Sequence, residues 1–275
     1  MKISYWGTRG SIATITHQTQ FYGGHTPCVA VGQGNDLLIL DAGSGIIQLG
    51  DLLLTRRPLN IHILLTHLHM DHIQGLGFFK PFFQPGLTLH IWGPQGNSPL
   101  KQRLNRYLSP PLFPVRIRDF DCKLEIFETP LEAFEIGTFQ IQARHICHPG
   151  PTLGYRVTNG TSTLAYLPDH EPALGARAFP GDPEWTSGYS LAREVDVLIH
   201  DAQFTEEEYR ERQGWGHSSY EQAIKFARLA QVKRLELFHH DPKHTDEQLD
   251  ALFASIEPQP FEIHLAREGN SIELP

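Results

Sequence analysis

Cysteine is scarce in this sequence, and its scarcity excludes a disulfide framework. The three cysteines, Cys28, Cys122 and Cys147, are scattered and odd in number, and no Cys-x-x-Cys pair offers a cysteine-based zinc site. Long apolar runs are also lacking, so no segment is predicted to span a membrane, and the first residues lack the features of a signal peptide. We therefore expect a cytoplasmic protein with no membrane partner.

Positive charge is in short supply as well. The formal net charge of −8 disfavours broad electrostatic binding to nucleic acid. A chain of 275 residues with 40% hydrophobic content can form one large core, and no break in composition demands a second domain. We predict a single domain over residues 1–275, and we leave homodimer formation open.

Histidine, by contrast, is abundant, and four metal-ligand side chains follow the apolar run Ile61–Leu65 within six positions. Alternate side chains of an extended segment share a face, so His67 and His69 can converge on one metal. Asp71 and His72 follow in the loop or at the start of a helix and can serve a second metal. Four such ligands favour metal binding over a polar turn, and imidazole with carboxylate suits Zn²⁺, and also Mn²⁺ or Fe²⁺.

Short β-like runs dominate the rest of the chain, and two helices are well marked. The predicted strands are Lys2–Trp6, Cys28–Val31, Leu37–Leu40, Leu87–Ile91, Leu124–Phe127, Phe139–His145, Thr163–Leu167, Val195–Ile199 and Leu235–Phe238. The polar residues between Cys28–Val31 and Leu37–Leu40 indicate a hairpin. A capping box at Ser218–Glu221 opens one helix, and Thr245 with Gln248 opens another.

Several of these later strands end in histidine or aspartate, as the run before His67 does. The strand ends carry His145 and His148, Asp169, His200 and Asp201, and His239 and His240. Functional groups often gather where strands end in layered folds of helices and sheets. Recurrence of this pattern along one chain predicts a shared site.

The order of these segments resembles the metallo-β-lactamase fold superfamily, whose His-x-His-x-Asp-His signature is met by His67–His72. Within it, the chain more closely resembles the phosphodiesterase branch, which includes tRNase Z-like and cyclic-phosphate phosphodiesterases. The segments that carry the comparison are Asp41-Ala-Gly-Ser-Gly, His148 before Gly154-Tyr155-Arg156, Asp169, His200-Asp201-Ala202, His217-Ser218-Ser219 and His239. The resemblance implies an α+β fold, the αββα sandwich, in which two mixed β-sheets are flanked by helices.

The resemblance also implies a dinuclear metal centre of two divalent ions, with Zn²⁺ favoured. Its ligand set on this chain would be His67, His69 and His148 for one metal, and Asp71, His72 and His239 for the other, with Asp169 and a water or hydroxide as bridges. Two alternatives stay open from the sequence: His145 in place of His148, and His240 in place of His239.

Two departures from the tRNase Z-like pattern bear on the substrate. Asp201 stands where those enzymes have glutamate, and no long basic arm is present to grip tRNA. We therefore predict a phosphodiesterase for a small phosphodiester, such as a cyclic or linear nucleotide, rather than for a large RNA. Asp71 would orient the nucleophile, and His217, held by Asp201, would protonate the leaving group.

Two other functions compete with this hypothesis. One is a metallo-hydrolase of lactone, thioester or amide bonds, and the other is a non-catalytic metal-binding protein. The aromatic, proline-rich segment Phe78–Pro114 has two interpretations as well. It is either a connection packed into the core or a lid or pocket wall that shapes substrate choice.

Overall fold

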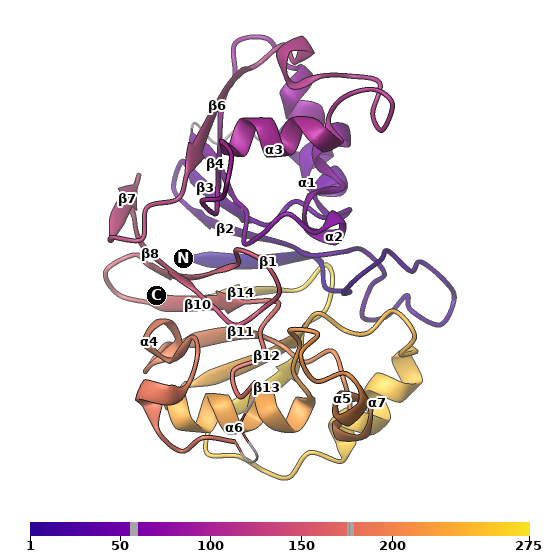
Figure 1. The fold of residues 1–275 in the computed structure, drawn as a ribbon, viewed down its shortest axis with the longest axis vertical. Helices are drawn as coiled ribbons and strands as arrows, with labels where there is room; N and C mark the ends of the chain where they lie inside the picture. Colours follow the sequence, from indigo (N-terminus) through magenta and orange to yellow (C-terminus); the bar gives the residue numbers. More distant parts are fainter. Residues whose placement is uncertain (56–59, 175, 177–178) are drawn as a thin grey trace.

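The computed structural model describes residues 1–55, 60–174, 176 and 179–275. Its strands form two seven-stranded sheets that lie face to face between outer helices (Figure 1). The strand order is β14-β1-β2-β3-β4-β5-β6 in the first sheet and β13-β12-β11-β10-β9-β8-β7 in the second. The αββα sandwich predicted from the sequence is confirmed.

The bounds of the elements are as follows. The first sheet comprises β1 (Lys2–Gly7), β2 (Cys28–Gln33), β3 (Asp36–Leu40), β4 (Asn60–Leu64), β5 (Thr88–Gly93), β6 (Lys123–Glu128) and β14 (Ser271–Glu273). The second comprises β7 (Phe134–Ile136), β8 (Phe139–His145), β9 (Leu153–Thr158), β10 (Thr163–Leu167), β11 (Val197–Asp201), β12 (Arg234–Phe238) and β13 (Glu262–Leu265). The α-helices are α1 (Ile46–Leu53), α2 (Met70–Ile73), α3 (Leu100–Tyr107), α4 (Tyr189–Ala192), α5 (Glu206–Glu211), α6 (Tyr220–Ala230) and α7 (Asp246–Ala254).

Each sheet contains a run of parallel strands, and this fixes where functional groups can meet. Strands β3, β4, β5 and β6 run parallel in the first sheet, and β10, β11, β12 and β13 do so in the second. The predicted hairpin is confirmed, because β2 pairs with β3 in antiparallel register. Carboxyl ends of parallel strands lie at one edge of a sheet, so each sheet presents its strand-end residues together.

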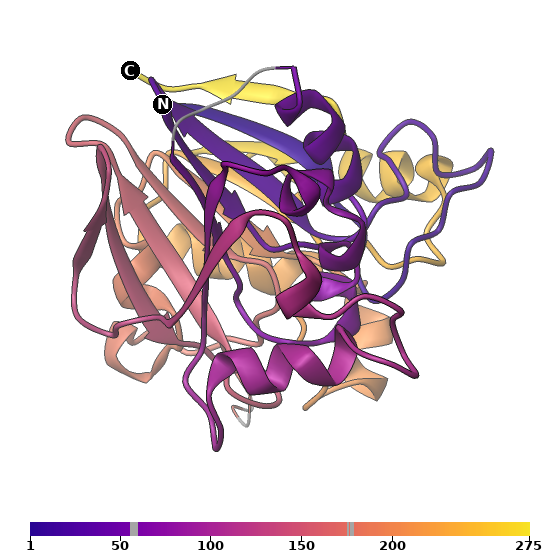
Figure 2. The same ribbon diagram turned by 90° about the horizontal axis from the view of Figure 1, so that it is seen from above.

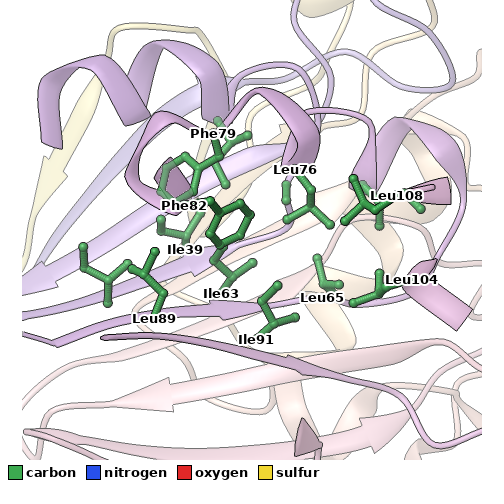
Figure 3. Close-up of a cluster of buried hydrophobic side chains, with 14 of the residues drawn as sticks. Ile39, Ile63, Leu65, Leu76, Phe79, Phe82, Leu89, Ile91, Leu104 and Leu108 are labelled. Atoms are coloured by element: carbon green, nitrogen blue, oxygen red, sulfur yellow. The ribbon is translucent and has the colours of Figure 1, made fainter. Parts of the chain in front are cut away.

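Three buried clusters hold the layers together. One cluster lies between the sheets, where Val29 and Leu40 of the first face Ile141 and Tyr166 of the second. A second cluster packs the first sheet against α1, α3 and the short helical turns after α2 (Figure 3). A third packs the second sheet against α4, α6 and α7. Successive side chains of a strand point to opposite faces of its sheet. Burial of apolar side chains on both faces stabilises the sandwich.

The chain ends lie side by side, as both views show (Figure 2). Strands β1 and β14 pair in antiparallel register, and the amino group of Met1 donates a hydrogen bond of 2.7 Å to the carbonyl of Leu274. Within the described ranges, no helix has both the length and the apolar character needed to cross a membrane.

The two predicted helices form, with one correction at a cap. The capping box of Thr245 and Gln248 at the start of α7 is confirmed. The box predicted at Ser218–Glu221 is wrong by one residue, because Ser219 caps α6 by accepting from the N–H of Gln222. The Ser218 hydroxyl instead donates to the carbonyl of His170 at 2.6 Å. Local spacing assigned the Ser218 side chain to the cap, but a tertiary hydrogen bond engages it instead.

The segment Phe78–Pro114 divides between the two interpretations. It contributes β5 to the first sheet, and the side chains of Phe79 and Phe82 are fully buried (Figure 3). Its other part, around α3, lines a cavity beside the predicted metal ligands. Strands β7, β9, β13 and β14 and helices α1, α3, α4 and α5 were not predicted from the sequence.

Candidate metal centre

The predicted ligands of the first sheet lie in the segment that follows β4 and in the short helix α2. His67 and His69 lie in the extended segment after the strand, and Asp71 and His72 lie on the first turn of α2. The reversal from strand to helix aims all four side chains at one edge of the sandwich. His69 is exposed, whereas the other three are buried.

The second sheet supplies single side chains, each near the carboxyl end of a different strand. His148 follows β8, Asp169 follows β10, Asp201 ends β11 and His239 follows β12. The expectation that β11 stops before His200 is therefore corrected, since pairing with β12 extends β11 through Asp201. The shared edge of β10, β11 and β12 brings residues distant in sequence into contact.

Two groups of metal-ligand atoms result, and we call them group one and group two. Group one contains His67, His69, His148 and Asp169, and group two contains Asp71, His72, Asp169 and His239, with the atoms of each group lying within 4.8 Å of one another. A further group of Asp201, His217 and His239 lies beside group two. The structure thus assembles every predicted ligand.

Asp169 belongs to both groups because each of its oxygens faces a different one. Its Oδ2 lies 3.7 Å from Nε2 of His67 and 3.8 Å from Nε2 of His148. Its Oδ1 lies 2.9 Å from Nε2 of His72 and 3.3 Å from Nε2 of His239. A carboxylate placed in this way can bridge two cations.

The donor set fits divalent metal ions. The buried Nε2 atom of His67 has no hydrogen-bond partner among the described residues, which is costly unless a ligand occupies it. Burial lowers the pKa of His67 and of His148, so both imidazoles are neutral, as metal ligation requires. Burial would raise the pKa of Asp71, but His72 and His239 hold it well below its usual range.

The position of His72 also favours positive charge. Burial would lower the pKa of His72, but the carboxylates of Asp169, Asp71 and Asp41 raise it well above its ordinary value. Three carboxylates around one imidazole create a strongly negative pocket. A divalent cation at group two would satisfy that field, and it would replace the proton on Nε2 of His72.

Outer contacts orient the ligands of group two. Asp41 accepts from Nδ1 of His72 at 2.8 Å, and it also accepts from Tyr166 and from Thr66. The backbone N–H of Ser11 donates to Oδ2 of Asp71 at 2.8 Å. The Asp41 segment was visible in the sequence, but the contacts of Ser11 and Tyr166 were not, since nothing local marks them.

His217 and Asp201 form a pair next to group two. Nδ1 of His217 lies 2.6 Å from Oδ2 of Asp201, and the ring stacks on His239 at a centroid distance of 5.0 Å. Burial would lower the pKa of His217, but the Asp201 carboxylate outweighs it and raises the pKa to about 9. With Nδ1 engaged, Nε2 is the ring nitrogen available to another group.

The rival histidines lie elsewhere. His145 ends β8 with an exposed side chain, and Nε2 of His240 lies 2.9 Å from the carbonyl of Ala266. Neither belongs to a group of metal-ligand atoms among the described residues. The geometry places His148 and His239, not these neighbours, against the other ligands.

A cavity of about 370 Å³ adjoins group one. Its wall includes His67 and His69, Arg103 and Arg106 of α3, and Pro149–Pro151. The Arg103 guanidinium donates to the carbonyls of Ser98 and Pro94, which holds this part of the wall in place. The cavity gives a molecule of modest size access to group one.

The fold and the two ligand groups define a sandwich of the metallo-β-lactamase type, with side chains that can hold divalent metal ions. A family described as beta-lactamase superfamily domain matches residues 37–240. The chain therefore belongs to the beta-lactamase superfamily, as its motifs predicted.

Individual relatives extend this comparison. The chain is similar to ribonuclease Z of Haloferax volcanii, at 24% identity over 318 residues that cover 100% of this chain and 95% of the relative. It is also similar in fold to human tRNase Z, short form, with a TM-score of 0.67, 21% identity and full coverage of both chains. A crystal structure described as a new diphosphatase from the PhnP family gives a TM-score of 0.70 at 18% identity, covering 100% of this chain and 98% of the other.

Proposed function

We propose that this chain is a dinuclear metal-dependent hydrolase of phosphodiester bonds. The observation that carries the proposal is Asp169, whose two oxygens face two separate sets of histidines. The relatives named ribonuclease Z and the PhnP-family neighbour support the same reaction class. Two bound divalent cations would make hydroxide available near neutral pH and neutralise the phosphoryl oxygens, and Zn²⁺ best fits the donor set.

The residues of this chain would divide the remaining work. His67, His69 and His148 would hold one cation, and Asp71, His72 and His239 would hold the other, with Asp169 between them. Asp71, fixed by the N–H of Ser11, would also orient the nucleophile. His217 would donate a proton from Nε2 to the leaving oxygen, since Asp201 engages Nδ1.

We propose a small phosphodiester, such as a cyclic or linear nucleotide, as the substrate. The cavity beside group one is of a size that suits a small ligand, and the cationic side chain of Arg106 at its wall suits a phosphorylated one. The net charge of −8 opposes the wide electrostatic contact that a large RNA requires.

A second candidate is processing of an RNA, favoured by the relatives named ribonuclease Z. The two candidates separate in one experiment with metal-reconstituted protein. Nucleoside 2′,3′-cyclic phosphate, bis-p-nitrophenyl phosphate, a precursor tRNA and a lactone are offered side by side, with Asp71→Asn as the inactive control. We expect turnover of the small phosphodiesters above the control. Efficient cleavage of the precursor tRNA would favour the second candidate, and turnover of the lactone alone would reject both.

A further inference from the structure

Glu171 is a buried acidic residue that the proposed chemistry does not use. It lies two positions after Asp169, and it is fully buried. Its carboxylate accepts from the N–H of Gly214 at 2.9 Å, from the N–H of Gly216 at 2.8 Å and from the hydroxyl of Tyr209 at 2.8 Å. No cation pairs with it among the residues that the structure describes, so these donors alone compensate its charge.

The contacts of Glu171 shape the loop that precedes His217. Gly214 and Gly216 adopt φ values of 86° and 87°, which favour glycine, and their N–H groups converge on the one carboxylate. The carbonyl of Gly216 then accepts from Nδ1 of His148 at 2.8 Å. The fit is tight, because a Cβ at Gly216 would lie 2.3 Å from that same Nδ1.

Glu171 also contacts the chain on the other side of His148. Its own N–H donates to the carbonyl of Cys147 at 2.9 Å. The residue therefore ties together the segment that carries His148 and the loop whose carbonyl receives the His148 ring. A ligating histidine commonly donates its second N–H to a carbonyl, which sets its tautomer and ring orientation.

We infer that Glu171 is a positioning residue for the group-one metal, acting through Gly216 on His148. With Nδ1–H given to Gly216, the lone pair of Nε2 faces Oδ2 of Asp169, 3.8 Å away. His217 has a separate anchor in Asp201, so loss of Glu171 affects His148 first. The inference rests on the proposed two-metal centre, but it does not depend on which bond is hydrolysed.

The test is the stepwise metal affinity of Glu171→Gln. The amide keeps the shape of the side chain but replaces one acceptor oxygen with an NH₂ group, so the N–H groups of Gly214 and Gly216 are left with a single, uncharged acceptor oxygen. Zn²⁺ affinities are measured by competition with a chromogenic chelator, and the ligand field by the visible absorption of Co²⁺-loaded protein. We expect one of the two sites to weaken by ~10–100-fold with an altered Co²⁺ spectrum, while the other site is unchanged.

The matched control is Glu208→Gln on α5. Glu208 also accepts a backbone N–H, that of Thr205 at 2.9 Å, and lies 3.1 Å from Nε2 of His244, but it contacts no ligand of either group. We expect this variant to lose thermal stability without changing either metal affinity. If Glu171→Gln instead lowers both affinities together with the melting temperature, its role is structural and the inference is wrong.

A second variant keeps the inference testable if Glu171→Gln does not fold. Tyr209→Phe removes only the hydroxyl donor to Glu171, and we expect a weaker loss confined to the same metal. Unchanged affinities in a folded Glu171→Gln, or in Tyr209→Phe where only that variant folds, would overturn the inference. Failure of the wild type to hydrolyse any phosphodiester, with both metals bound, would reject the proposed function and leave this inference standing.

Discussion

Group two of the metal centre is buried throughout, whereas group one reaches the surface at His69 and borders the cavity. Group two also carries more outer contacts, since Asp41 holds His72 and Ser11 holds Asp71. In group one, His67 contacts Thr66, and His148 relies on a backbone carbonyl in a glycine-rich loop. The difference teaches that group two is the half with more supporting contacts, while group one borders the cavity in which the proposed substrate would lie.

The largest effect should follow from removing the group that the two halves share. Asp169→Ala takes one oxygen from each group, so we expect loss of metal at both and a fall in turnover of about 10³-fold or more. Metal analysis and hydrolysis of bis-p-nitrophenyl phosphate check this, with circular dichroism to verify the fold. A folded variant that keeps both metals would show that Asp169 does not bridge.

The next effect concerns the pair beside group two. If His217 protonates the leaving group, His217→Ala should slow hydrolysis of a ribose-type phosphodiester by ~10²–10⁴-fold. The loss should be much smaller on bis-p-nitrophenyl phosphate, because nitrophenolate leaves as a stable anion. Equal losses on both substrates would point to phosphate binding, and loss of a metal would make His217 a ligand.

Asp201→Asn should follow the same pattern more weakly, and the loop contacts of Asp201 add a cost in stability that His217→Ala does not carry. Asp201 also accepts from the N–H groups of Gln203 and Ser218, and an asparagine amide can satisfy fewer of these donors. Comparing the thermal stability of the two variants separates the effect on the imidazole from the effect on the loop.

A smaller effect tests the outer contacts of group two. Asp41→Asn weakens the acceptor for Nδ1 of His72, so we expect a ~10–100-fold loss of affinity for one metal. Chelator competition measures it, as for Glu171→Gln. If the two variants weaken different sites, their Co²⁺ spectra will differ, and identical spectra would contradict the division into two independently oriented groups.

The burial of the two groups also predicts an order of metal loss. A chelator should remove the group-one metal first, because His69 is exposed and the cavity gives access to that side. Stopped-flow release of Zn²⁺ should then be biphasic, with the fast phase assigned by its acceleration in His69→Ala. A single phase, or acceleration of the slow phase in His69→Ala, would contradict the difference in accessibility between the two groups.

The smallest effect is a pH dependence in the metal-free protein. Because the pKa of His217 rises to about 9, its imidazolium stabilises the metal-free fold fully below pH 6.5, and this contribution is lost as the pH rises through 9. Relative to His217→Ala, the wild type should therefore lose unfolding free energy between pH 6.5 and 9. Denaturant titrations of both proteins measure the difference, and a flat difference would contradict the ion pair with Asp201.

One local motif of the sequence supplies two ligands to each group, His67 and His69 to group one and Asp71 and His72 to group two. The spacing of His67, His69, Asp71 and His72 is local, so a strand followed by a helix suffices to bring them together. His148 is different, because its position depends on a loop 68 residues further along the chain. The local sequence around Gly214 and Gly216 does not identify His148 as the partner of that loop.

The core shows the same limit. Periodicity located Phe139–His145 and Thr163–Leu167 to the residue, because an alternating apolar run marks a strand buried on one face and a continuous run marks a strand buried on both. Short edge strands such as β14 lack such an apolar pattern, since β14 forms through its pairing with β1. The aromatic segment after the motif divides between core and cavity wall for the same reason, since composition does not say which face a side chain meets.

The sequence by itself determined the superfamily, the sandwich and the ligand types, because these depend on residue identity, spacing and apolar period. The resemblance predicted Asp169 as the bridge, but only the tertiary structure decided that His148 and His239 rather than their neighbours face the other ligands, and that Glu171 and Ser11 support them. These features come from strands and loops that meet at one edge of two sheets. No local pattern encodes them, since each contact joins segments whose distance along the chain is set by the topology.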